Sequence, residues 1–304
     1  ANNQHYELPA EFFEQVLGKA RKYSCGWWPS GVKSLDEAEE LALQASCERA
    51  NLAAGQDILE LGCGWGSLSL WMASHYPGAN ITAISNSNSQ GEYIRGKARE
   101  QGLTNLRVVT ADMNDLVAGN REMLKRLVPE DGFDRVVSVE MFEHMSNWPA
   151  LFESVRRWLR EDGQFFMHIF CHRHTPYEFS IEGDDDWMAK YFFTGGIMPS
   201  DSLPPLVAAQ TEGLQFRQQW RWYGNDYAHT ANAWLANMDA RKAEIMPLMR
   251  ETYGEDSDIW WNRWRLFFMA CAELFAWRDG REWWVGHYLF ERTLEGALKQ
   301  EEAA

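Results

Sequence analysis

An α/β fold with a Rossmann-like parallel sheet and a mostly helical cap is predicted for this chain of 304 residues. Between residues 57 and 170, short apolar runs alternate with amphipathic stretches, which is typical of a doubly wound parallel sheet. After residue 171 the pattern changes to long, aromatic-rich helical stretches before a last strand. An insertion at that place would cover the crevice at the carboxyl ends of the strands, where open α/β sheets bind ligands.

Residues 1–54 are expected to form a helical segment and a lid. Apolar side chains recur at helical spacing after a proline, at Phe12, Phe13, Val16 and Leu17. Tyr23, Ser24 and Cys25 follow in a loop that is rich in aromatic residues, which a lid over a ligand and a packed surface loop explain equally well. Ser34 and Glu37 have the spacing of a capping box, which predicts a helix from there to about residue 53.

Residues 55–171 are expected to form the nucleotide-binding core. Strands are predicted at 57–61, 80–85, 106–110, 133–139 and 164–170, with helices at 67–74, 90–101, 120–127 and 149–159. Residues 172–292 are expected to hold the cap and two closing strands, and residues 293–304 a tail. This part has predicted helices at 201–211, 230–253 and 258–277 and strands at 216–222 and 282–292, which brings the sheet to seven strands.

The composition excludes several classes of protein. The formal net charge of -15 disfavours binding to nucleic acid or to anionic lipid and suits a cationic ligand, although simple solubility explains it too. The five cysteines form no CxxC pair, which favours a reducing compartment. Because the sequence has neither a run of about twenty apolar residues nor a signal peptide, we expect a cytoplasmic protein without stable membrane association. A homodimer is left open.

A glycine-rich turn at residues 60–66 organises the chain. Its sequence is Glu-Leu-Gly-Cys-Gly-Trp-Gly, after an apolar run and before an amphipathic stretch. A phosphate loop would need a lysine after Gly66, and a dinucleotide site would need a carboxylate after the second strand, which ends in Ser85-Asn86-Ser87. The turn matches [DE]-x-G-x-G-x-G in full, the pattern of S-adenosylmethionine-binding class I methyltransferases. Asp112, just past the third strand, is expected to bind the same cofactor or to cap a helix.

The densest group of chemically active side chains follows the fourth strand. Glu140, Glu143 and His144 lie within five residues, at the carboxyl end of a predicted strand. Glu140 and His144 are four residues apart, so a helical turn would place them on one face. Two carboxylates and an imidazole can hold an ammonium group, take its proton and pass it on. A capped βα turn with a partly buried histidine is the structural alternative.

Other reactive residues give weaker signals. Cys25 has no histidine at a spacing that indicates nucleophilic catalysis. His168, His172 and His174 do not have the spacing of a zinc signature, so no metal site is expected. The aromatic residues of 260–275 and Trp283 and Trp284 are expected to pack in the core. Some of them would still be able to line a pocket for a cation, because a cation over an aromatic face gains about 0.5–2 kcal/mol.

Several segments together resemble the coclaurine N-methyltransferase group of the cyclopropane fatty acid synthase superfamily. They are residues 5–9, Tyr23-Ser24-Cys25, the glycine turn, Ser85-Asn86-Ser87 with Gln90, residues 140–145 and the tail from Trp261 to Tyr288. The resemblance implies a class I fold dependent on S-adenosylmethionine, with S-adenosylhomocysteine as product and Glu140, Glu143 and His144 as catalytic groups. The cofactor would be held by Tyr23, Ser24, Glu60, Gly62, Gly64, Gly66, Asn86, Gln90, Asp112 and Met113.

The same resemblance leaves a second activity open. Cyclopropane synthases use bicarbonate held by a Cys, a Glu, a His and a Tyr, and the matching positions here are Cys25, Glu140, His168 and Tyr227. Phe170 stands where the synthases usually have isoleucine. We therefore expect methyl transfer to the nitrogen of a small, aromatic or alkaloid-like amine. The alternative is methylene or methyl transfer to an unsaturated lipid with bicarbonate as base.

Overall fold

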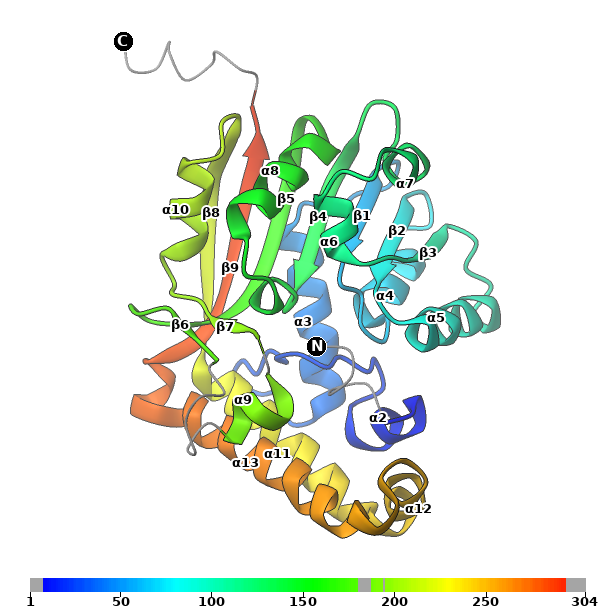
Figure 1. Ribbon diagram of the computed structural model, residues 1–304, viewed down its shortest axis with the longest axis vertical. Helices are drawn as coiled ribbons and strands as arrows, with labels where there is room; N and C mark the ends of the chain where they lie inside the picture. The colour runs from blue at the N-terminus through cyan, green and yellow to red at the C-terminus, as the bar shows by residue number, and fades with distance from the viewer. Residues whose placement is uncertain (1–7, 180–186, 194, 294–304) are drawn as a thin grey trace.

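The computed structural model describes residues 8–179, 187–193 and 195–293, and its centre is a seven-stranded sheet in the order β3-β2-β1-β4-β5-β9-β8 (Figure 1). The strands β1 to β5 are mutually parallel, β9 pairs antiparallel with β5, and β8 pairs antiparallel with β9. The predicted seven-stranded α/β fold with a helical cap is confirmed. Its strands are β1 (Asp57–Leu61), β2 (Asn80–Ser85), β3 (Leu106–Thr110), β4 (Phe133–Val139), β5 (Leu159–His172), β8 (Leu214–Tyr223) and β9 (Trp283–Arg292).

Two layers of helices cover the sheet. On one face, α8 (Trp148–Trp158) packs with α6 (Met113–Val117), α7 (Arg121–Leu127) and α10 (Leu203–Ala209). On the other face, α3 (Leu35–Arg49) and α4 (Ser67–His75) pack against Ile58, Val137 and Phe166, and α5 (Asn88–Glu100) lies beside α4. The capping box predicted at the start of α3 is present, with Ser34 and Glu37 each accepting from the other's backbone N–H.

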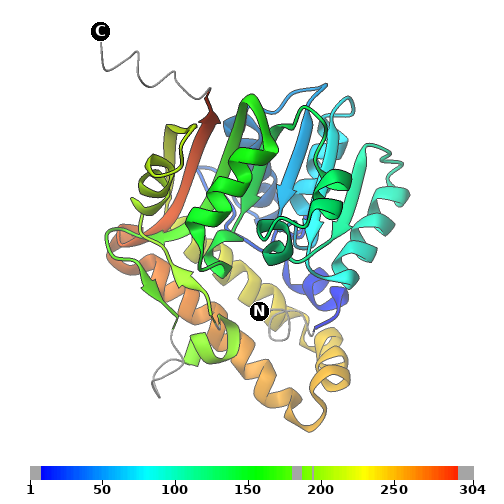
Figure 2. The same ribbon diagram turned by 45° about the horizontal axis from the view of Figure 1, so that its top comes forward.

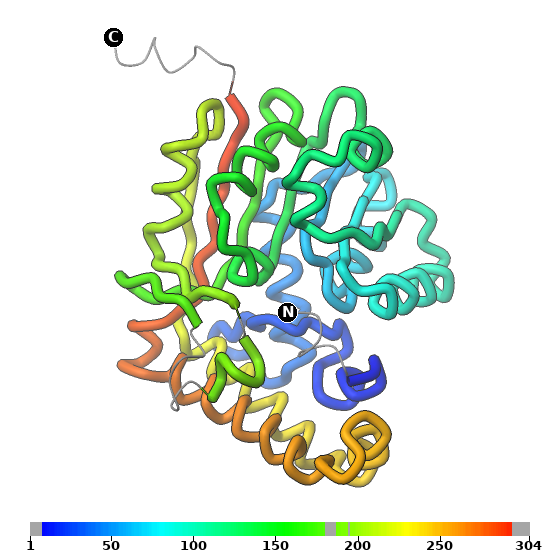
Figure 3. The backbone as a smooth tube through the Cα atoms, in the orientation of Figure 1, coloured from blue at the N-terminus to red at the C-terminus, as the bar shows by residue number. Residues whose placement is uncertain are grey.

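The cap is a separate aromatic cluster below the carboxyl ends of β1, β4 and β5 (Figures 1 and 2). It consists of α2 (Ala10–Val16), α9 (Trp187–Phe192), α11 (Gly224–Ala240), α12 (Lys242–Tyr253) and α13 (Ser257–Gly280). The trace in Figure 3 shows α11 and α13 lying side by side, and Phe268 of α13 packs on Trp234 of α11 with ring centroids 5.7 Å apart. The predicted aromatic core of residues 260–275 is therefore the core of the cap.

The helix predicted over residues 230–253 is in fact two helices. Arg241 leaves helical geometry at φ -112° and ψ 30°, and its guanidinium donates to the carbonyl of Gln15 at 2.7 Å. That tertiary contact with α2 fixes the corner between α11 and α12. The pairing of β6 (Tyr177–Glu178) with β7 (Ile197–Met198) was not predicted, because two-residue strands leave no periodicity to detect.

Other sequence expectations are not settled by the fold. The triple aspartate at 184–186 lies outside the described residues. The three boundaries between the four predicted segments, at 54/55, 171/172 and 292/293, stay predictions. In the described part of the chain, the helices are too short or too polar to cross a lipid bilayer.

Candidate active site

The glycine turn closes tightly because its neighbours leave no room for side chains. Gly62, Gly64 and Gly66 have φ values of 77°, 50° and 81°, which residues other than glycine rarely adopt. A Cβ at Gly62 would lie 2.5 Å from Cγ of Met141, and one at Gly66 would lie 2.6 Å from Cγ1 of Ile94. The turn therefore brings bare backbone next to the start of α4, and it holds Met141, the neighbour of Glu140, against β1.

A cavity of 610 Å³ lies over this turn. Nine of the ten residues predicted to bind the cofactor line it, namely Tyr23, Ser24, Glu60, Gly62, Gly64, Asn86, Gln90, Asp112 and Met113. The tenth, Gly66, lies outside the lining and serves as the N-cap residue of α4 in a left-handed conformation. Asp112 caps α6 by accepting from the N–H of Asn114 at 2.7 Å, as one of its two predicted roles requires; it also lines the cavity, and its contact with the cofactor stays a prediction.

The polar groups of this cavity fit a nucleoside. Glu60 is 3% exposed and accepts from the hydroxyl of Ser69, which leaves carboxylate capacity for a ribose hydroxyl. Gln90 accepts from the hydroxyl of Ser85 at 2.8 Å, and its buried amide nitrogen has no hydrogen-bond partner among the described residues. Buried donors are rarely left unsatisfied, so a ligand with acceptor atoms is expected at Gln90. S-adenosylmethionine meets these requirements.

The carboxyl group of Glu60 gives the first testable prediction. Burial raises its pKa to about 7, above the ordinary 4.5. The stability associated with the protonated group is thus fully present below about pH 4.5 and is lost as the pH rises through 7. In the absence of cofactor, we therefore compare the unfolding free energy of the original protein with that of Glu60→Gln. We expect the original protein to lose about 2 kcal/mol relative to the variant when the pH rises from 5 to 8.

Denaturant titrations at the two pH values measure this difference. Glu40→Gln, on the exposed face of α3, controls for the loss of one negative charge. A difference between Glu60→Gln and the original protein that is the same at pH 5 and pH 8 would contradict the burial of an ionisable Glu60.

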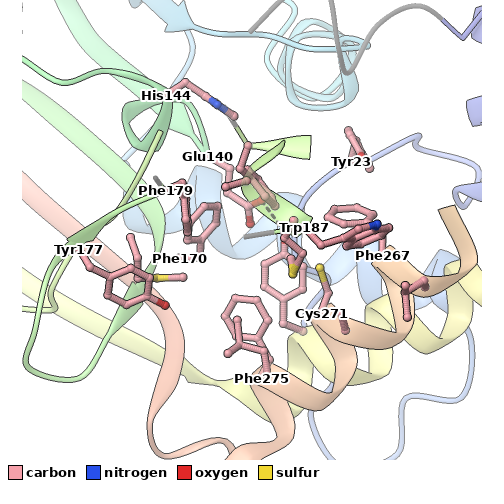
Figure 4. A pocket seen from close by; sticks show the side chains of 18 of the residues that line it. Tyr23, Glu140, His144, Phe170, Tyr177, Phe179, Trp187, Phe267, Cys271 and Phe275 are labelled. Carbon is pink, nitrogen blue, oxygen red and sulfur yellow. Dashed lines mark hydrogen bonds between the residues drawn. The ribbon is translucent and has the colours of Figure 1, made fainter. Parts of the chain in front are cut away.

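A second cavity of 530 Å³ lies between the sheet and the cap (Figure 4). Its walls are mostly aromatic, and Figure 4 shows the rings of Phe179, Phe267 and Phe275 around it. Its charged lining groups are the carboxylates Glu140 and Glu178, and none of its described lining residues is a lysine or an arginine. We call it the acceptor cavity, and the one over the glycine turn the cofactor cavity.

Three residues line both cavities: Tyr23, Glu140 and His144. Tyr23 comes from the loop after α2, whereas Glu140 and His144 follow β4. A group transferred from a ligand in one cavity to a ligand in the other must pass among these side chains. The structure thus brings Glu140 and His144, which the sequence analysis grouped together, next to Tyr23, which it assigned to cofactor binding.

Glu140 is the centre of the polar network at this junction. Its Oε1 accepts from the N–H of Cys25 at 3.1 Å and lies 3.1 Å from Nε2 of His168, and its Oε2 accepts from the hydroxyl of Tyr227 at 2.7 Å. Glu140 has φ 47°, a left-handed conformation that costs a residue other than glycine about 1–2 kcal/mol. This left-handed conformation turns the chain directly after β4, and the carboxylate of Glu140 lies where the two cavities meet.

The pKa values at the junction favour proton exchange. Burial raises the pKa of Glu140, while the charge of Lys22 and the hydrogen bond from Cys25 oppose that rise. Burial lowers the pKa of His144, which favours the neutral imidazole, and the charge of Glu140 opposes this shift. Lys22 is itself buried and donates to the hydroxyl of Ser24 and the carbonyl of Cys25, at 2.6 and 2.7 Å.

Glu140 and His144 do not share a helical face as the sequence analysis expected. The residues from Phe142 to His144 form one turn of 3-10 helix, and the left-handed Glu140 precedes it. Glu143 lines neither cavity. It is 1% exposed, and its Oε1 accepts from the N–H of Phe170 at 2.8 Å, which ties the 3-10 turn to β5.

The four residues of the bicarbonate hypothesis lie close together, with Cys25, His168 and Tyr227 around the carboxylate of Glu140. Cys25 and His168 lie behind Glu140 and line neither cavity, whereas Tyr227 lines the acceptor cavity. The N–H of Cys25, Nε2 of His168 and the hydroxyl of Tyr227 all lie within hydrogen-bond distance of the Glu140 carboxylate. The thiol of Cys25 donates to the carbonyl of Gly26 at 3.1 Å, and burial raises its pKa well above the ordinary value.

The sequence analysis missed three charged or titratable residues near the junction. Lys22 immediately precedes the segment Tyr23-Ser24-Cys25, and this position next to the segment was the available signal. Arg49 and His287 come from α3 and β9, and a separation of 238 residues gave no local pattern to detect. In the described part of the chain, no group of three or more His, Cys, Asp or Glu side chains is arranged to hold a metal ion.

Comparisons with known proteins show the family to which the chain belongs. The family model described as Mycolic acid cyclopropane synthetase matches residues 1–281. The chain is 33% identical to an (S)-coclaurine N-methyltransferase of Papaver somniferum, over 94% of this chain and 79% of that protein. It is 30% identical to the cyclopropane-fatty-acyl-phospholipid synthase of Escherichia coli strain K12, over 97% of this chain and 69% of the relative. A crystal structure of coclaurine N-methyltransferase bound to N-methylheliamine and SAH superposes with a TM-score of 0.86 and 32% identity, over 96% of this chain and 81% of that one.

Proposed function

The chain belongs to the Mycolic acid cyclopropane synthetase family, and we propose that this S-adenosylmethionine-dependent methyltransferase methylates the nitrogen of a small amine with an aromatic body. The acceptor cavity carries the proposal. It offers carboxylates at Glu140 and Glu178 within aromatic walls, and no lysine or arginine among the described lining residues. An ammonium group finds its counter-ion there, and a ring finds its packing surface.

The aromatic walls support a cationic ligand in a second way. Phe275 stacks on Tyr227 with centroids 4.3 Å apart, so the ring beside Glu140 is held rigidly. A cation over such a face gains about 0.5–2 kcal/mol. The methylated product keeps a positive charge when it is protonated or quaternary, so the same surface suits product and substrate. The similar solved structure holds an N-methylated ligand, which adds support.

The chemistry at the junction is deprotonation and alignment. S-adenosylmethionine supplies an electrophilic methyl group on a sulfonium. The attacking nitrogen needs a free lone pair, so the ammonium must first lose its proton. Glu140, whose pKa is raised by burial, is placed to bind the ammonium and to accept that proton. His144 borders both cavities and is placed to pass the proton on, and Glu143 holds the turn that carries His144.

Lipid methylation with bicarbonate is the second candidate. It has the Escherichia coli relative and the convergence of Cys25, His168 and Tyr227 in its favour. The lining of the acceptor cavity favours the amine, because aromatic rings with the carboxylates of Glu140 and Glu178 suit a compact cationic ligand. The small-molecule amine is thus the partner that we propose. The homodimer and the cytoplasmic location stay predictions.

Binding of matched ligands tests the proposal. Calorimetric titrations in the presence of S-adenosylhomocysteine would compare aromatic secondary amines with isosteres in which CH₂ replaces the nitrogen. We expect the protonated amines to bind at least about tenfold more tightly, since they pair with Glu140 and the rings. Equal affinity of amine and isostere, or binding of unsaturated phospholipid vesicles in preference to both, would overturn the assignment.

A further inference from the structure

A buried row of hydrogen bonds runs from α3 to the carboxylate of Glu140. The guanidinium of Arg49 lies 2.6 Å from Nδ1 of His287, Nε2 of His287 lies 2.8 Å from Nδ1 of His168, and Nε2 of His168 lies 3.1 Å from Oε1 of Glu140. The four residues come from α3, β9, β5 and the end of β4. The register places His168 opposite His287 in the antiparallel pair of β5 and β9.

The chemistry of arginine fixes the direction of every bond in this row. A guanidinium has donors only, so Nδ1 of His287 must accept from Arg49. A neutral His287 then carries its proton on Nε2 and donates it to Nδ1 of His168. His168 in turn carries its proton on Nε2, where the acceptor is the Glu140 carboxylate. One donor-only residue thereby determines both tautomers.

The surroundings keep both imidazoles neutral. Both histidines are 0% exposed, and the ring of Trp222 packs against each, at centroid distances of 5.5 Å to His168 and 4.3 Å to His287. Burial lowers the pKa of each histidine well below the ordinary 6.5, and the charges of Lys22 and Arg49 lower it further. Arg49 is held in place over the rings of Trp27, Trp220 and Trp222, at 5.3–5.7 Å.

The row cannot release protons, because it ends in a group that does not accept them. Burial lowers the pKa of Arg49 to about 10, and the guanidinium remains charged at neutral pH. We propose that Arg49 and His287 are positioning residues that lock His168 as a permanent donor to the Glu140 carboxylate. The effect on catalysis rests on the proposed role of Glu140 as the base, whereas the lock itself does not.

The lock acts on the pH at which Glu140 is ionised. A hydrogen bond to the charged form of a carboxyl group favours that form, so the donor from His168 counteracts the effect of burial. His168 faces Glu140, Lys22, Arg49 and His287 among ionisable groups. Glu140 in turn interacts through charge or hydrogen bonds with further ionisable groups. They are Lys22, Cys25, Glu143, His144, Tyr227 and Cys271.

Nitrogen NMR of the intact protein tests the lock directly. Long-range ¹H–¹⁵N spectra of histidine-labelled protein distinguish the two neutral tautomers and the imidazolium, and spectra of His287→Gln identify the two resonances. We expect His168 and His287 to be Nε2–H tautomers from pH 6 to pH 9. An Nδ1–H tautomer or an imidazolium at either position would overturn the proposal, whatever reaction the enzyme catalyses.

Variants test the consequence for Glu140. Arg49→Met and His287→Leu are expected to move the acidic limb of the kcat/KM profile to higher pH by about one unit. His287→Gln is expected to restore the limb, because its amide can accept from Arg49 and donate to His168. His75→Gln, at an exposed position, is the control, and thermal unfolding checks folding. A uniform loss of activity at all pH values, without a shifted limb, would contradict the positioning role.

Discussion

Glu140→Gln is expected to lower kcat for amine methylation by about 100- to 10,000-fold, the range that a positioned general base contributes. Glutamine keeps the size of the side chain and can still accept from Cys25 and His168 through its oxygen. It cannot take a proton from an ammonium group or neutralise its charge. We therefore expect the affinity for S-adenosylmethionine to change by less than about threefold, since the cofactor cavity has its own polar contacts at Glu60 and Gln90.

Glu178→Gln is the matched control, because Glu178 is the other carboxylate of the acceptor cavity but lies away from the cofactor cavity. It should raise KM for the amine several-fold and leave kcat nearly unchanged, as expected when binding rather than proton transfer is weakened. Steady-state kinetics with both variants measure the contrast. Near-normal kcat in Glu140→Gln would remove Glu140 from the reaction.

Gly62→Ala is the second substitution with a large expected effect. The added Cβ requires a left-handed alanine and meets Cγ of Met141 at 2.5 Å, so the turn or the Met141 side chain must move. We expect a loss of about 3 kcal/mol of unfolding free energy, from backbone conformation and overpacking together. Because the displaced turn forms the floor of the cofactor cavity, the affinity for S-adenosylmethionine should fall at least about tenfold.

Gly102→Ala separates the contribution of backbone conformation from that of overpacking. Gly102 has φ 67°, but a Cβ there meets nothing within 4 Å. This variant should lose about 1 kcal/mol and bind the cofactor normally. Denaturant unfolding and equilibrium binding measure both quantities, and equal behaviour of the two variants would show that close packing against Met141 does not matter.

The sheet and the cofactor cavity were predictable because their signals are local. Apolar runs between turns located the seven strands, and the spacing of Gly62, Gly64 and Gly66 after Glu60 identified the cofactor turn. The break at Arg241 was not predictable, because the contact that fixes it is with Gln15, far away in the sequence. The same limit applies to β6 and β7, whose pairing depends on tertiary contacts.

The candidate site shows the same division. Glu140 and His144 were found by their density after β4, and Tyr23 by its motif. The expected helical face was wrong, because Glu140 adopts a left-handed conformation that no spacing rule anticipates. Glu143 has the same local signal as its neighbours but is turned towards β5. His287 and Arg49 could be linked to Glu140 only after the pairing of β5 with β9 was known.

The position of the transferred methyl group tests the central claim most directly. The protein would be incubated with S-adenosylmethionine carrying a ¹³C methyl group and a mixture of an aromatic secondary amine and unsaturated phospholipid vesicles. A single ¹³C NMR spectrum distinguishes an N-methyl group from a cyclopropane or C-methyl carbon. Our account predicts that the label appears as an N-methyl group on the amine. Label in the lipid fraction, with the amine unmethylated, would contradict it.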